Sequence, residues 1–132
     1  MTTSELIEAY YAHFNTMNWN AMLELLTDEV AHDVNESSRE IGKAAFKAFF
    51  ERMNRSYAEH ISDISVTVNA DGSRSAAEYV VSGTYQLTDA GLPEARGQRY
   101  RLPGGAFFEV TNGKISRVTN YYNLQLWLQQ IK

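Results

Sequence analysis

The chain has 132 residues, which is a single-domain length, and we expect one domain over residues 1–132. Its 16 acidic against 12 basic residues give a net charge of −4, which argues against nucleic-acid binding, because binding to phosphates needs a basic surface. The chain has no cysteine, which excludes disulfides, a thiol nucleophile and thiolate metal ligands. Residues 1–5 lack the features of a secretory signal, and no apolar stretch has membrane-spanning length. We therefore expect a cytoplasmic protein that binds neither membrane nor nucleic acid.

Three amphipathic helices are predicted in the first half of the chain. The first follows a capping box over residues 2–5 and carries an apolar stripe with a period of 3.6, formed by Leu6, Ile7, Tyr10, Tyr11, Phe14 and Met17. Asn18 begins a second, shorter helix. Residues 30–34 read as a short strand and residues 35–40 as a loop. Gly42 opens a third helix with an aromatic face, formed by Ala45, Phe46, Phe49, Phe50 and Met53.

After residue 60 the hydrophobic period changes to two, which predicts strands. The first strand has one face formed by Ser62, Ile64, Val66 and Val68. Asp71-Gly72 and Asn112-Gly113 are hairpin signals. Residues 88–97 read as a long loop, and Pro103-Gly104-Gly105 as a bulge in the third strand. A short helix is predicted at the C-terminus.

Helices followed by consecutive strands indicate an α+β fold and not an alternating α/β fold. We expect the helices to pack in the concave face of a curved, mostly antiparallel sheet, a cystatin-like cone. It would have three main helices plus the short C-terminal one. A twisted sheet that curls around helices leaves a concavity, and an aromatic-lined concavity is a typical ligand site.

The order α-α-β-α-β-β-β-β resembles the nuclear-transport-factor-2-like superfamily. Three segments carry the likeness: Tyr-Tyr-Ala-His-Phe-Asn over residues 10–15, Leu-Leu-Thr-Asp-Glu-Val over residues 25–30, and Gly-Lys-Ile over residues 113–115. Within the superfamily the chain resembles the SnoaL-like polyketide cyclases and ketosteroid-isomerase-related proteins, over nearly its whole length. This resemblance implies an apolar pocket, and it is compatible with enzymes and with binding proteins.

Resemblance to the ketosteroid isomerases implies a catalytic tyrosine, a carboxylate base and a protonated aspartic acid. The tyrosine position falls on Tyr10. The base position falls beside His32 and Asp33: an ungapped alignment places Val34 there and turns His32 inward, whereas a one-residue gap turns Asp33 inward. We favour Asp33. The third position falls on Ala106, which cannot donate a hydrogen bond.

Asn120 shares the expected inner face of the last strand with Val118 and Tyr122, where an amide needs a partner or a ligand. SnoaL-like cyclases present an aspartate from this strand; an asparagine can orient a carbonyl or a water but cannot act as a base. With Asn120 and Ala106, the expected ligand-binding residues are Tyr122, Trp19, Phe14, Tyr79, Tyr85 and Phe108.

The leading hypothesis is an isomerase or cyclase that acts by proton transfer on a small hydrophobic carbonyl compound. The alternatives are a non-catalytic ligand-binding protein and, ranked lower, an epoxide hydrolase, which needs two carboxylates flanking an arginine. The three histidines show no metal-binding spacing, so no metal and no cofactor are expected. Phe107 and Tyr121 are predicted on the outer sheet face, and we expect a homodimer through that face.

Overall fold

Side-chain hydrogen bonds cap the first two helices in the computed structural model, which describes residues 1–132. Helix α1 (Thr3–Asn15) begins at a capping box in which the side chains of Thr2 and Glu5 each accept a hydrogen bond from the other residue's amide. Helix α2 (Trp19–Glu24) is capped by the Asn18 side chain, and α3 (Lys43–Ser56) follows Gly42. The three predicted helix starts are therefore confirmed. Met17 is the exception to the predicted stripe, because it lies beyond α1 and is 72% exposed.

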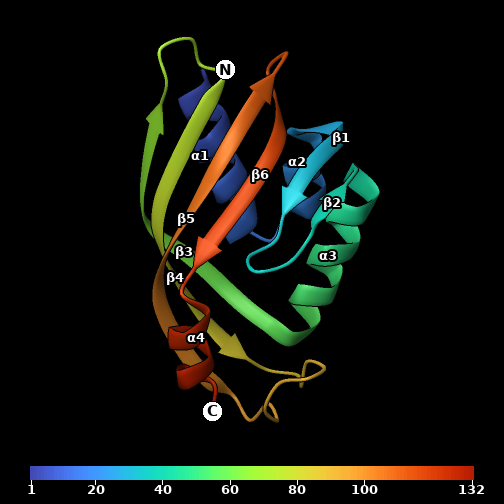
Figure 1. The fold of residues 1–132 in the computed structure, drawn as a ribbon, viewed down its shortest axis with the longest axis vertical. Coiled ribbons are helices and arrows are strands. Elements are labelled where there is room, and N and C mark those ends of the chain that lie inside the picture. The colour runs from blue at the N-terminus through green and yellow to red at the C-terminus, as the bar shows by residue number, and fades with distance from the viewer.

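Six strands form one sheet in the order β2-β1-β6-β5-β4-β3. Their bounds are β1 (Leu26–Asp33), β2 (Arg39–Ile41), β3 (Tyr57–Val68), β4 (Arg74–Tyr85), β5 (Gln98–Thr111) and β6 (Lys114–Tyr122). Neighbouring strands are antiparallel except β1 and β6, which are parallel. The sheet curves around α1, α3 flanks its β1–β2 edge, and α4 (Leu124–Gln130) lies near the C-terminal end (Figure 1). The expected α+β cone is confirmed. Strands β3–β6 form the antiparallel meander, and β1 and β2 extend the sheet to six strands.

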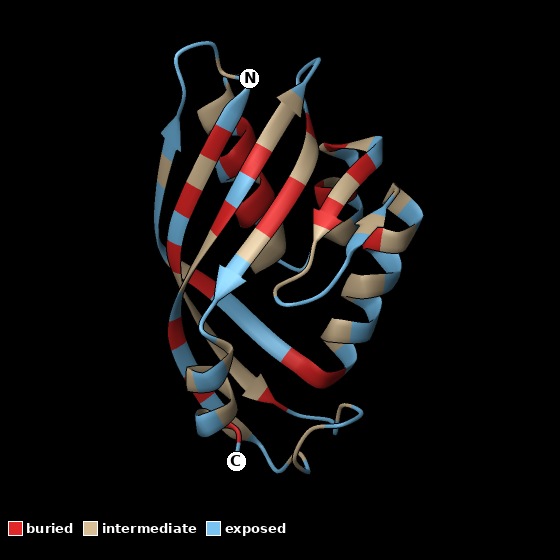
Figure 2. Ribbon diagram, viewed as in Figure 1, coloured by how far each residue is buried: buried red, intermediate tan, exposed pale blue.

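Two apolar clusters fill the concave side of the sheet. The larger joins the buried face of α1 to strands β1 and β3–β6, and the smaller lies beneath α4, formed by Tyr57, Tyr85, Tyr100, Leu102 and Ile131. Buried and exposed residues alternate along the strands, as a sheet with one covered face requires (Figure 2). The functional site described below lies where the two clusters meet.

Strand β3 begins at Tyr57, earlier than predicted, and is interrupted by a bulge. Its register against β4 shifts between Ser62 and Ser65, and Asp63 within the shift has φ 53°. Before the bulge the odd-numbered residues face the interior, whereas after it the inward residue is Val66. The predicted face was therefore wrong at Ile64, which is exposed.

The predicted bulge at residues 103–105 was also wrong. The β4–β5 register is continuous through these residues, and the irregularity in β5 lies at Glu109 and Val110. Gly104 serves a packing role instead, since a Cβ there would lie 2.7 Å from the ring of Tyr79. Both predicted hairpins are present: β3–β4 turns at residues 69–73, and Asn112 and Gly113 take the positive φ values of a tight β5–β6 turn. None of the helices combines the length and apolar character needed to cross a bilayer.

Candidate functional site

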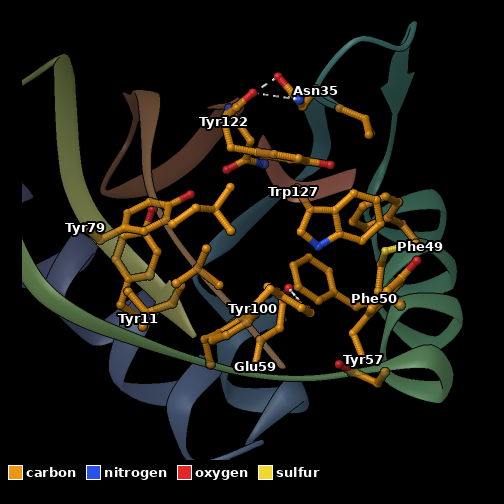
Figure 3. Close-up of a pocket in the computed structure, with 18 of the residues that line it drawn as sticks. Tyr11, Asn35, Phe49, Phe50, Tyr57, Glu59, Tyr79, Tyr100, Tyr122 and Trp127 are labelled. Carbon is orange, nitrogen blue, oxygen red and sulfur yellow. Dashed lines mark hydrogen bonds between the residues drawn. The ribbon is translucent and has the colours of Figure 1, made fainter. Parts of the chain in front are cut away.

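A cavity of about 310 Å³ lies between α1, α3, the concave face of the sheet, and the loop and helix near the C-terminal end (Figure 3). This volume is at the lower end of the range of small-molecule sites, which is about 300–1,000 Å³. Most of the lining is apolar or aromatic. The polar groups are contributed by Asn35, Asn54, Glu59, Asp89 and Asn120 and by the hydroxyls of Tyr10, Tyr11, Tyr57, Tyr79, Tyr100 and Tyr122.

Glu59 is the carboxylate that faces this cavity from the sheet. It lies between Tyr57 and Ile61 on the inward face of β3. The Tyr100 hydroxyl donates a 2.5 Å hydrogen bond to Oε2 of Glu59, while Oε1 has no hydrogen-bond partner in the protein. The Glu59 residue as a whole is exposed, but the groups packed around its carboxyl displace part of its water and raise its pKa, and the hydrogen bond from Tyr100 acts in the opposite direction. The site thus holds a carboxylate with one free oxygen and enhanced basicity.

Two glycines make room for the tyrosines of the cavity wall. The Tyr100 ring lies over Gly83 on the neighbouring strand, where a Cβ would come within 2.2 Å of the ring. Tyr79 lies over Gly104 in the same way. Each ring occupies the volume that a side chain on the adjacent strand would fill, which fixes the position of its hydroxyl.

Phenol hydroxyls form a second polar group at the α1 side of the cavity. The rings of Tyr11 and Tyr79 lie 5.5 Å apart, and the buried Tyr11 hydroxyl has no hydrogen-bond partner. Burial raises the pKa of Tyr79 to about 12 and also raises the pKa values of Tyr10 and Tyr11. These hydroxyls therefore stay protonated at neutral pH. A buried donor without a partner is rare and is available to a ligand oxygen.

A second pair of carboxylate and tyrosine lies at the loop over residues 86–97. The Tyr57 hydroxyl donates a 2.8 Å hydrogen bond to Asp89, whose other oxygen accepts from the Ala90 amide. The Tyr85 hydroxyl accepts from the Asp89 amide and donates to the Pro93 carbonyl. The loop is thereby tied to β3 and β4, and Asp89 is held at the cavity wall.

The structure settles which of the two β1 candidates points inward, and the favoured choice of Asp33 was wrong. The His32 side chain is inside and 1% exposed, whereas Asp33 is on the outer face. There its carboxylate accepts two hydrogen bonds from Arg39 and one from Thr119, and mainly the Arg39 bonds lower its pKa to about 2. Val34 lines the cavity, as the ungapped alignment implies.

His32 lies behind the cavity wall and is not among the residues that line it. Its ring packs 4.6 Å from Phe46 and 4.8 Å from Phe49, measured between centroids. Nε2 lies 3.4 Å from Nδ2 of Asn120, and Nδ1 lies 4.0 Å from a carboxylate oxygen of Glu40. Burial lowers the pKa of His32 to about 4, so the ring is neutral at pH 7. The imidazole therefore contacts the site through Asn120.

The other residues expected at the site divide into two groups. Tyr10, Phe14, Tyr79, Asn120 and Tyr122 line the cavity. Four others lie outside the lining and serve packing roles. Trp19 packs on Phe14 and Phe50, and Tyr85 anchors the loop. Ala106 and Phe108 are core residues.

Sequence reasoning missed Glu59, Tyr100 and Asp89. Tyr57, Glu59 and Ile61 alternate in the pattern of a strand, but the charged residue in the middle conceals a face that is otherwise apolar. Tyr100 alternates with Arg99 and Arg101 along its strand, a pattern that indicates a buried packing residue and carries no signal of a functional role. Asp89 lies in an irregular loop, where no periodic signal exists.

Residues 7–118 match the model of the SnoaL-like domain family. The chain is 55% identical to a proposed polyketide cyclase from Pseudomonas putida KT2440, with a TM-score of 0.98 and coverage of 100% of this chain and 99% of that one. A proposed polyketide cyclase from Xanthomonas campestris pv. campestris is 57% identical, with a TM-score of 0.97 and coverage of 98% and 96%. A third, from Silicibacter sp. TM1040, is 45% identical, with a TM-score of 0.96 and coverage of 98% and 95%. No protein with curated annotation matches the chain. With its cone-shaped fold and the family match over most of its length, the chain belongs to the SnoaL-like domain family.

Proposed function

We propose that this protein is an enzyme that moves a proton at a carbon next to a carbonyl group in a small, mostly apolar cyclic compound. The reaction would be an isomerisation or an aldol-type cyclisation, with Glu59 as the base. The observation that carries this proposal is the free Oε1 of a carboxyl that faces a mostly apolar cavity, where partial desolvation raises its pKa. A carboxylate with raised pKa is matched to proton abstraction near neutral pH.

In the proposed first step, Oε1 of Glu59 takes the proton from the carbon beside the carbonyl. The electrons of that C–H bond move onto the carbonyl oxygen and give an enolate. The hydroxyl of Tyr11 or Tyr79 donates a hydrogen bond to this oxygen, because both phenols remain protonated at neutral pH. Tyr100 holds Oε2 and leaves Oε1 free to react.

Two outcomes complete the reaction. In an isomerisation, Glu59 returns the proton to a different carbon of the enolate. In a cyclisation, the enolate carbon attacks a second carbonyl of the same molecule, and the proton on Glu59 passes to the alkoxide that forms. In both, the carboxylate is regenerated and no redox partner is needed.

Deuterium exchange into 2-tetralone tests the proposal without knowledge of the natural substrate. The protein in D₂O should exchange the protons beside the carbonyl faster than buffer alone, as measured by NMR. Glu59→Gln should reduce the excess rate by about 10²–10⁴-fold, the usual contribution of a general base. Asp33→Asn is the matched control, because it removes a carboxylate outside the cavity. Equal rates in wild type and Glu59→Gln would refute the assignment of the base.

Ala106 motivates a second candidate, a ligand-binding protein without catalysis. Its side chain is buried in the core and offers no hydrogen bond, whereas ketosteroid isomerases need an acid there. Binding of 2-naphthol, which resembles the enol of 2-tetralone, without any exchange would favour this candidate. The epoxide-hydrolase alternative needs an arginine in the pocket, and no arginine lines the cavity.

A further inference from the structure

The formal charges on the residues that line the cavity are all negative. Among its lining residues, Glu59 and Asp89 are the ionisable acids, and neither lysine nor arginine nor histidine is present. The remaining polar groups are amides and hydroxyls, which carry no net charge. A ligand in the cavity would therefore meet two carboxylates and no cation.

Neither carboxylate has a cationic partner elsewhere in the protein. Glu59 accepts its hydrogen bond from Tyr100, and Asp89 accepts from Tyr57 and from the Ala90 amide. The ion pairs of the structure involve other acids. Neutral donors stabilise a carboxylate but leave its charge in place, so the negative potential of the cavity is not cancelled within it.

The nearby basic groups are not among the residues that line the cavity, or they carry no charge. Arg52 lies over the ring of the lining residue Phe49, 5.5 Å from its centroid, but does not itself line the cavity. Arg99 and Arg101 alternate along β5 with the inward Tyr100 and therefore face the convex side of the sheet. Arg39 pairs with Asp33 on that outer side. His32, behind the wall, is neutral at pH 7. Apolar walls concentrate the field of a charge inside a cleft, which strengthens its effect on a bound ligand.

We propose that the cavity selects its ligands by charge: it accepts apolar compounds whose polar groups are neutral or cationic, and it excludes carboxylates. This inference rests on the proposed function in taking the cavity as the substrate site. The substrate would then be a ketone, an ester or an amine derivative, and a free carboxylic acid would need esterification or amidation before it could bind. The residues responsible are Glu59, with Asp89 as the second contributor.

Three compounds on one naphthalene frame test this selection. They are 2-naphthol, 2-naphthoic acid and 2-naphthylmethylamine, which are neutral, anionic and cationic at pH 7.5. Calorimetric titration should show the acid binding at least tenfold more weakly than the naphthol, and the amine binding at least as tightly. Glu59→Gln should reduce the ratio of the dissociation constants of acid and naphthol, the affinity gap, by about tenfold. Asp89→Asn should reduce this ratio by a smaller factor.

The control is again Asp33→Asn, which changes the net charge of the chain by the same amount from outside the cavity and should leave the gap unchanged. Comparable affinity for acid and naphthol, a gap that survives in Glu59→Gln, or no binding of any of the three compounds would each overturn the inference. The 2-tetralone assay separates the two proposals. If the ligands are selected by charge but 2-tetralone does not exchange its protons, only the proposed enzymatic function is refuted. If 2-tetralone exchanges but the ligands are not selected by charge, only the proposed charge selection is refuted.

Discussion

Glu59 and Tyr100 lie on two strands that are not neighbours, yet a 2.5 Å hydrogen bond joins them. Both are paired in register with Gly83 of the strand between them. Because Gly83 has no side chain, the Tyr100 ring crosses above it and its hydroxyl reaches Glu59. The candidate base is therefore positioned by one row of three residues across β3, β4 and β5.

Gly83→Ala should break this arrangement. The new methyl group would overlap the Tyr100 ring, and overpacking of this kind costs about 1–3 kcal/mol in the free energy of unfolding. Urea denaturation should show that loss, and the 2-tetralone exchange rate should fall with it. Gly105→Ala is the control, because its nearest neighbour, the Ala77 carbonyl, would be at an ordinary contact distance of 3.5 Å. A Gly83→Ala protein as stable as the wild type would contradict the proposed positioning.

Glu59→Gln should make the protein slightly more stable above neutral pH. The folded-state pKa of Glu59 is raised, so its ionisation costs stability as pH rises through that pKa, and the cost is absent below the unfolded value near 4.5. We expect a gain of less than about 1 kcal/mol at pH 8, because the cavity admits solvent that screens the charge. Thermal unfolding of both proteins at pH 8 and pH 4 measures it. A gain at pH 4 as large as at pH 8 would show that ionisation is not the cause.

Asp33→Asn should have the opposite pH dependence. The hydrogen bonds from Arg39 and Thr119 lower the pKa of Asp33 to about 2, from an ordinary value of 3.8. The stabilisation is therefore present above about pH 4 and is lost as pH falls through 2. Because the carboxylate is partly exposed, we expect a loss of about 1 kcal/mol at pH 7. Denaturant titrations between pH 7 and pH 2 should show that the free energies of unfolding of the wild type and Asp33→Asn become equal at the acid end. A difference in unfolding free energy that does not change with pH would exclude the ion pair as its source.

The buried imidazole of His32 should carry its proton on Nδ1. The atom that faces Nδ1 is a carboxylate oxygen of Glu40, which can only accept, so Nε2 is left to accept from the Asn120 amide. The carbonyl oxygen of Asn120 would then be free for a hydroxyl of the ligand. Nitrogen-15 NMR distinguishes the two tautomers, and it should show a neutral ring between pH 5 and pH 8. Protonation at Nε2, or titration near pH 6.5, would contradict this assignment.

We propose that two copies of the chain pair through the convex face of the sheet. Phe107 and Tyr121 form an exposed aromatic pair there, with ring centroids 5.8 Å apart. A charge at Phe107 should prevent the association, so sedimentation of Phe107→Asp should give the mass of a monomer and wild type that of a dimer. Leu87→Asp, which places a charge at an exposed apolar residue in the loop after β4, should leave the dimer intact. A monomeric wild type would refute the pairing.

The helices and hairpins could be predicted because their signals are local. The capping box before α1, the cap at Asn18 and the Asn112-Gly113 turn each act within a few residues of sequence. The inward choice between His32 and Asp33 is different, because it depends on the phase of β1 against β6. A change of one residue in that phase exchanges the two side chains, and no local feature of the sequence fixes it.

The glycine signals were ambiguous for a similar reason. Pro103-Gly104-Gly105 has the composition of a bulge, but Gly104 is explained by the Tyr79 ring, which comes from a residue distant in sequence. Gly83 has the same role for Tyr100. A small residue inside a strand shows that something lies close to the backbone there, and only the assembled sheet shows which side chain it is.

The bulge at Asp63 determines which side chain of β3 faces the cavity. If β3 had no bulge, every second residue counted back from Val66 would face the interior. His60 would then point inward and Glu59 would point to solvent. The one extra residue of the bulge therefore determines whether the carboxylate of Glu59 or the imidazole of His60 faces the cavity. Loss of a single codon in this segment would exchange the two, and relatives that differ there by one residue would be expected to act on different substrates while they keep the same architecture.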